Sequence, residues 1–131
     1  MAAWRIAPVL VVGSVEESIR YYRDRLGFEV IGTFGSPLEM AFVGAHGIQI
    51  MLQDAEGKAI PGPNGDYKSI AWDALLWVDD ARALHARVEV AGARVRKAPY
   101  VTFYGHTEFE VVDPDGYVLC FSQAPMTSPQ P

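Results

Sequence analysis

Apolar residues follow two kinds of spacing along the chain, and the same order of spacings occurs twice. Residues 6–12 form a short valine-rich apolar run, which favours a buried strand. Four apolar residues at helical spacing come next: Val15, Ile19, Tyr22 and Leu26. Ser14 stands three residues before Glu17, which is typical of a capping box, and Gly27 is placed to end the helix. Residues 28–34, 38–43 and 47–53 are then predicted as three strands.

The second half repeats this order. Residues 70–78 are predicted as a strand, and Asp79 or Asp80 can cap the following helix. The apolar face of that helix consists of Ala81, Leu84, Val88 and Ala91, and Gly92 ends it. Strands are predicted over 93–98, 106–112 and 117–123, with a turn at residues 113–116 (Asp-Pro-Asp-Gly).

The internal repeat predicts an α+β fold of two βαβββ modules. We expect the modules to form a curved mixed sheet around a cleft, with the helices on the outer side. Residues 1–123 are then a single domain, with modules at 4–53 and 70–123 joined by a linker or mobile loop at 54–69. The Pro-, Ser- and Gln-rich tail at 124–131 is expected to be flexible.

Composition narrows the functional classes. The net charge is −5 with both signs interspersed, so no basic patch indicates nucleic-acid binding. The single cysteine, Cys120, excludes an internal disulfide and fits a reducing compartment. The N-terminal apolar run is too short, and too soon followed by Glu16 and Glu17, for a signal peptide or membrane span. We therefore expect a cytoplasmic protein that contacts neither nucleic acid nor membrane.

Several segments taken together resemble one known family. They are residues 8–18, Tyr21-Tyr22-Arg23-Asp24, Leu26-Gly27-Phe28, residues 48–53, Glu108-Phe109 and residues 113–117. In this order and spacing they resemble the vicinal oxygen chelate superfamily (glyoxalase, bleomycin resistance protein, extradiol dioxygenase). The match covers roughly residues 4–123, and it is closest to the metal-free members similar to bleomycin-resistance proteins. The resemblance implies a homodimer, but it says little about chemistry because this fold has many functions.

The resemblance also places the metal ligands of the metal-using members on four positions here: Ala7, Gln49, Asp73 and Cys120. Ala7 has no donor atom, its neighbours Ile6 and Pro8 cannot bind a metal either, and no histidine stands at any of the four positions. We therefore expect no metal site of the family type and no cofactor.

Strand alternation assigns the two faces of the sheet. Leu10, Val12, Leu119 and Phe121 are expected under the helices. The cleft face is expected to hold Ala7, Val9, Gln49, Met51, Asp73, Leu75, Trp77, Val118 and Cys120, with Tyr100, Phe103 and Tyr104 at its mouth. An apolar, aromatic groove with a few acids suits a flat or cationic organic molecule.

His106, Glu108 and Glu110 fall on one strand face, with Phe109 and Val111 in the core. The three polar residues could form an atypical metal site or an acid/base set. We expect them instead to be surface-exposed or dimer-contact residues, and Cys120 to be an inert buried thiol.

Three functional hypotheses remain. The first is a protein that binds a small aromatic or cationic molecule without the family metal site, using Gln49, Met51, Asp73, Trp77, Tyr100, Phe103, Tyr104, His106, Glu108 and Cys120. The alternative is a metal-dependent lyase, transferase or dioxygenase with atypical ligands drawn from Gln49, Asp73, His106, Glu108, Glu110 and Cys120. A third is a metal-free isomerase or epimerase with Glu108 or Glu110 as base. The missing donor at Ala7 favours the first.

Overall fold

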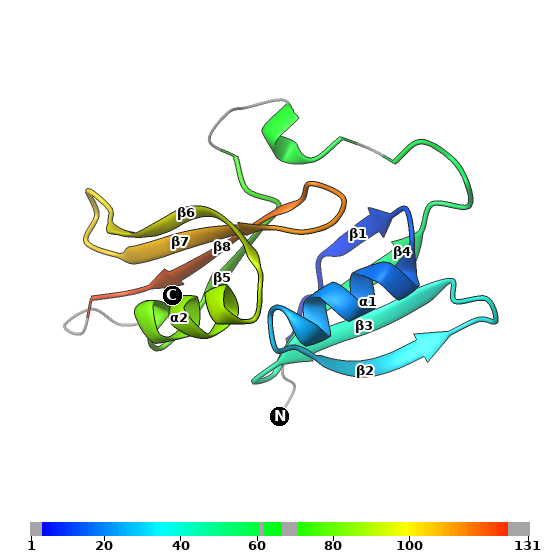
Figure 1. Ribbon diagram of the computed structural model, residues 1–131, viewed down its shortest axis with the longest axis horizontal. Helices are drawn as coiled ribbons and strands as arrows, with labels where there is room; N and C mark the ends of the chain where they lie inside the picture. The colour runs from blue at the N-terminus through cyan, green and yellow to red at the C-terminus, as the bar shows by residue number, and fades with distance from the viewer. Residues whose placement is uncertain (1–3, 61, 67–70, 126–131) are drawn as a thin grey trace. The chain divides into compact units, whose positions relative to one another are not determined.

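The computed structural model describes residues 4–60, 62–66 and 71–125 (Figure 1). Its strands form two four-stranded sheets. Contacts divide the chain into two compact units, Met1–Pro61 and Gly62–Pro131, and each unit contains one sheet and one α-helix.

The first unit follows the predicted order of elements. It contains β1 (Val9–Val12), α1 (Val15–Asp24), β2 (Glu29–Phe34), β3 (Met40–Ala45) and β4 (Ile48–Asp54). The strands lie in the order β1-β4-β3-β2, with β1 parallel to β4 and the other pairs antiparallel.

The second unit has the same topology. It contains β5 (Ala74–Trp77), α2 (Ala81–Val90), β6 (Arg94–Val101), β7 (Thr107–Val112) and β8 (Val118–Gln123). The order β5-β8-β7-β6, again with parallel outer pairing of β5 and β8, confirms the predicted α+β class and the two βαβββ modules.

The strand ends differ from the predictions by a few residues. β1 begins at Val9 rather than at residue 6, and β6 continues to Val101 rather than ending at residue 98. In the predicted linker, Asn64–Asp66 form a single 3-10 turn, whereas residues 61 and 67–70 lie outside the described residues. At the C-terminal end Ala124 is buried, and residues 126–131 of the predicted tail lie outside the described part of the chain.

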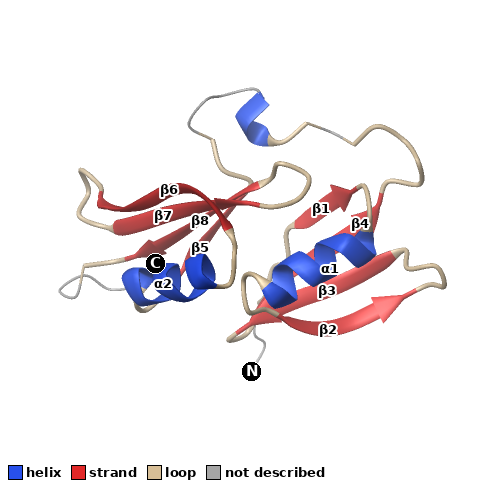
Figure 2. Ribbon diagram, viewed as in Figure 1, coloured by secondary structure: helices blue, strands red, loops and turns tan. Residues whose placement is uncertain are grey.

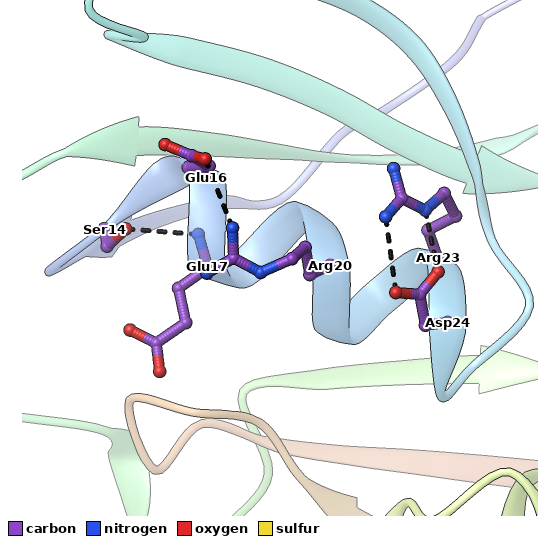
Figure 3. A network of polar contacts seen from close by, with 6 residues as sticks. All are labelled: Ser14, Glu16, Glu17, Arg20, Arg23 and Asp24. Atoms are coloured by element: carbon purple, nitrogen blue, oxygen red, sulfur yellow. Dashed lines mark hydrogen bonds and ion pairs between the residues drawn. The ribbon is translucent and has the colours of Figure 1, made fainter.

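Helix α1 begins where the sequence predicts. Ser14 Oγ accepts a hydrogen bond from the Glu17 backbone N–H at 3.1 Å, while the Glu17 carboxyl points away from Ser14 (Figure 3), so only half of the capping box forms. Exposed ion pairs join Glu16 to Arg20 and Arg23 to Asp24 along the same helix (Figure 3). Such exposed pairs contribute little to stability, so the buried face decides where the helix packs.

Each helix lies against one face of the sheet of its own unit (Figure 2). The residues predicted under the helices, Leu10, Val12, Leu119 and Phe121, are all buried, which confirms the face assignment for these positions. Neither helix of the described residues is long and apolar enough to cross a lipid bilayer.

The close approach of β3 and β4 at Gly44 can be tested by substitution. A Cβ atom added there would overlap the carbonyl oxygen of Ile48, whereas one added at Gly32 on β2 would meet nothing within 4 Å. We expect Gly44→Ala to lower the free energy of unfolding by at least ~2 kcal/mol, because the strands must separate. Gly32→Ala should stay within about 0.5 kcal/mol of the natural protein. Urea unfolding of both variants checks this, and equal stabilities would contradict the close approach.

Candidate functional site

A pocket of about 350 Å³ lies within the second unit. We call it the aromatic pocket, and it is lined by Trp72, Arg96, Lys97, Tyr100, Thr102, Phe103, Tyr104 and Glu110. These residues come from the segment before β5, from β6, from the β6–β7 turn and from β7.

The alternation of β7 places the pocket on the sheet face opposite α2. Phe109 is fully buried and packs edge-on against the ring of His85 on α2, with centroids 5.4 Å apart. Glu108 and Glu110 therefore point to the other face, as the sequence predicts. However, their side chains are not surface-exposed: Glu108 is 1% and Glu110 is 4% exposed. The predicted surface exposure was wrong for both residues. Side-chain alternation gives only the face to which a residue points, whereas groups on neighbouring strands and segments cover these two carboxyl groups.

The carboxyl group of Glu110 has partners on both oxygens. The Trp72 indole N–H donates to Oε2 at 3.0 Å, and an Arg96 guanidinium nitrogen lies 3.5 Å from Oε1. Trp72 is itself held in place, because the Asn64 side-chain amide donates to its backbone carbonyl at 2.8 Å. Glu110 thus holds the Trp72 ring in place, and the Arg96 cation on the neighbouring strand β6 balances its charge.

The carboxyl group of Glu108 is bound differently. Its Oε2 accepts hydrogen bonds from the Tyr104 hydroxyl at 2.6 Å and from the Ser122 hydroxyl at 2.9 Å, while Oε1 is buried without a hydrogen-bond partner. His106 Nδ1 lies 3.0 Å from Ser122 Oγ. Since the only hydroxyl proton of Ser122 is directed to Glu108, we infer that His106 carries its proton on Nδ1 and donates to Ser122.

Four of the eight residues that line the pocket are aromatic. Lys97 Nζ lies 4.7 Å from the centroid of the Tyr100 ring, which is the geometry of a cation–π contact. Phe103, which is fully exposed, packs edge-on against Tyr104 with centroids 5.0 Å apart. Burial raises the pKa of Tyr104, and its hydrogen bond to Glu108 raises it further, so this phenol remains a donor. The arrangement can stack a flat ring and place a cation near carboxyl groups.

Asp73, a predicted ligand residue, has both oxygens engaged by the backbone. Oδ1 accepts from the Asn64 N–H and Oδ2 accepts from the Val118 N–H, each at 2.8 Å. Asp73 therefore joins the 3-10 turn and β8 to the start of β5.

Cys120 is fully buried, and burial raises the pKa of its thiol strongly, with further increases from Glu108 and Glu110. The thiol stays protonated at neutral pH, as expected of an inert buried cysteine.

The four positions implied by the resemblance do not fit a metal. Ala7 and Gln49 border a hollow of about 160 Å³ in the first unit, together with Arg5, Ile6 and Gly47, but this lining offers one weak donor and one cation. Asp73 is already bonded to the backbone, and Cys120 keeps its proton. Among the residues that the structure describes, no three His, Cys, Asp or Glu side chains come together to hold a metal ion.

The structure brings some predicted site residues together and leaves others apart. Tyr100, Phe103 and Tyr104 line the aromatic pocket, and Glu108 lies behind Tyr104. Trp77 is 46% exposed on the edge strand β5 and does not line it. Gln49 and Met51 belong to the other unit.

Sequence reasoning missed other pocket residues: Trp72, Arg96, Lys97 and Thr102. β6 changes register at Val95/Lys97 and at Lys97/Tyr100, so neighbouring Arg96 and Lys97 line the same pocket. Regular alternation would place these two residues on opposite faces. The position of Trp72 next to Asp73 was the one local signal available.

The family model described as the Glyoxalase/Bleomycin resistance protein/Dioxygenase superfamily matches residues 5–121. Among curated proteins, none matches the chain.

Solved structures similar to this chain include TioX from Micromonospora sp. ML1 (TM-score 0.75, 15% identity, 94% of this chain and 100% of that one). A bleomycin resistance determinant encoded on the transposon Tn5 is also similar (TM-score 0.74, 19% identity, covering 95% and 100%). Lactoylglutathione lyase from Agrobacterium tumefaciens is a third (TM-score 0.68, 16% identity, covering 93% and 94%). At these identities the likeness shows the fold alone.

We expect Asp73 to stabilise the fold. We expect Asp73→Ala to lower the free energy of unfolding by about 2–3 kcal/mol, because the Val118 and Asn64 N–H groups lose a charged acceptor. Asp79→Ala, which removes an exposed acid just before α2, should cost less than about 0.5 kcal/mol. Urea unfolding of both variants checks this, and a neutral Asp73→Ala would show that these bonds contribute nothing net.

Cys120 should make stability depend on alkaline pH. The folded thiol keeps its proton, whereas the unfolded thiol loses it near the ordinary value of 9.0, so stability is fully present below that pH and declines above it. The natural protein should lose up to ~1.4 kcal/mol more per pH unit above pH 9 than Cys120→Ala does. Urea unfolding from pH 7 to 10 measures both slopes, and parallel curves would contradict the raised pKa.

Proposed function

The chain belongs to the glyoxalase/bleomycin resistance protein/dioxygenase superfamily, and on this basis we propose that it binds a small aromatic or cationic molecule without the metal site of that family. The aromatic pocket is the proposed binding site. We further propose that the protein acts by binding alone, so that shape and charge suffice and no covalent step is required.

The observation that carries this proposal is the composition of the aromatic pocket. Trp72, Tyr100, Phe103 and Tyr104 provide ring surface, and the Glu110 carboxyl lies at the wall with Glu108 behind it. The rings favour flat molecules through stacking, and rings and carboxyl groups attract cations against the opposing charges of Arg96 and Lys97 in the same lining. A largely apolar pocket with a few polar groups is also typical of small-molecule binding.

The donor set supports binding over metal chemistry. Ala7 offers no donor, the Asp73 oxygens hold backbone N–H groups, and the Cys120 thiol keeps its proton. The similar structures include both a resistance determinant and a lyase, and they do not decide between the hypotheses.

The same proposal includes a homodimer in the cytoplasm. Large apolar side chains stay exposed on each unit, among them Val9 on β1 and Leu75 and Trp77 on β5. Such residues would be covered by a second copy of the chain, as the family resemblance implies.

Phe103→Ala tests the pocket with a matched control. Phe103 is fully exposed, so its removal should leave the fold intact, and Phe34→Ala removes an equally large exposed ring from β2 in the other unit. For aromatic cations and neutral aromatics found in a thermal-shift screen, we expect Phe103→Ala to weaken binding roughly threefold to tenfold, the loss of one ring contact. Phe34→Ala should bind like the natural protein. Isothermal titration calorimetry measures both.

Two outcomes would overturn the proposal. One is equal weakening by both variants, or no binding by any aromatic or cationic compound. The other is near-stoichiometric nickel, zinc, iron or manganese in protein purified without chelator or affinity metal, measured by elemental mass spectrometry. That second outcome would favour the metal-dependent alternative.

A further inference from the structure

The hydrogen bonds of Glu108 are unevenly divided between its two oxygens. Oε2 accepts hydrogen bonds from the Tyr104 and Ser122 hydroxyls, whereas Oε1 is buried without such a partner, and the Cys120 thiol is a weak donor beside this carboxyl group. The 2.6 Å distance from the Tyr104 oxygen is typical of a hydroxyl that donates to a charged carboxylate. A buried acceptor without a donor is costly, so a donor brought to Oε1 would lower the free energy of this group.

The two carboxyl groups of this sheet face also differ in charge balance. Glu110 has a guanidinium nitrogen of Arg96 3.5 Å away and the Trp72 indole N–H on its other oxygen. Within the described residues, Glu108 has only neutral donors and no ion pair. Arg96 and Lys97 both line the pocket, and Arg96 already offsets the charge of Glu110. A cation brought to this face therefore gains more from Glu108, which has no ion pair, than from Glu110.

Tyr104 separates Glu108 from the pocket. Its side chain is 45% exposed and lines the pocket, while its hydroxyl contacts the carboxyl. The backbone of this turn is fixed by hydrogen bonds between Thr102 and His106 and between Gly105 and Thr102. The turn is therefore held by bonds that do not involve the Tyr104 side chain.

We propose that Glu108 binds the cationic group of the ligand: an amidinium, guanidinium or protonated amine attached to a flat aromatic body donates an N–H to Glu108 Oε1. The aromatic body then lies against Tyr100 and Tyr104. Tyr104 moves aside or shares the carboxyl, and its ring stays in contact with the ligand. This inference rests on the proposed function, and it selects the aromatic cation from the wider class given there.

The test uses two probes of nearly the same shape, benzamidine (cationic) and benzamide (neutral), titrated into the natural protein by calorimetry at pH 7. We expect benzamidine to bind at least tenfold more tightly than benzamide. Glu108→Gln keeps the size of the side chain and removes its charge, so it should reduce this preference to about twofold or less. Asp79→Asn changes the net charge equally at an exposed position away from the pocket, and it should keep the tenfold preference.

Tyr104→Phe provides a second, independent arm that keeps Glu108 charged. It removes the hydroxyl that competes for the carboxyl and retains the ring, so the preference for benzamidine over benzamide should rise at least threefold. This arm decides the question even if Glu108→Gln does not fold.

The outcomes separate this inference from the proposed function. Equal binding of the two probes to the natural protein would overturn the role of Glu108 and leave an aromatic-binding pocket. A preference that survives in Glu108→Gln, or an unchanged preference in Tyr104→Phe, would do the same. If neither probe binds while other aromatic compounds from the thermal-shift screen do, this inference alone fails. If nothing binds, the proposed function fails with it.

Discussion

The rings of Phe109 and Phe121 stack with centroids 5.0 Å apart and planes only 14° apart, and this contact fixes β7 against β8. Because side chains alternate along a strand, a slip of β7 by one residue would move Phe109 out of the core and turn the carboxyl groups of β7 toward α2. The observed register instead places Glu108 opposite Ser122 and Glu110 opposite Cys120. The core contact on one face thus determines which polar groups meet on the other.

The two faces of the second sheet therefore differ in character: one packs against α2, and the other carries the polar and aromatic groups. Its α2 face is closed by apolar packing, with Val111 and Leu119 fully buried beside the stacked rings. Its other face carries hydroxyl, carboxyl and aromatic groups, of which Glu108, Glu110 and Ser122 are buried. Polar groups in that position are tolerated when they are hydrogen-bonded, and the open Oε1 of Glu108 is the exception. A ligand that donates a hydrogen bond to this atom would remove that cost. Binding would then also stabilise the fold.

The site was predicted in part. Tyr100, Phe103, Tyr104 and Glu108 were expected on the open side of the sheet, and they lie in or directly behind one pocket. Asp73 was chosen by position, but position did not show that its oxygens hold two backbone N–H groups. Trp72 escaped notice because its partner, Glu110, lies 38 residues away in the sequence. Arg96 and Lys97 escaped because the irregular register of β6 breaks the alternation on which face assignment depends.

The sequence by itself determined the class of fold, the repeat of two βαβββ modules, the starts of both helices and the buried faces. These features follow from patterns within a few residues, such as the Ser14 and Asp80 caps and the apolar spacing of the helices. Only the tertiary structure decided which side chains meet across strands: Trp72 with Glu110, His106 with Ser122, and Asp73 with Val118. Those contacts join residues 16 to 45 positions apart, and strand register, not local spacing, brings them within hydrogen-bond distance.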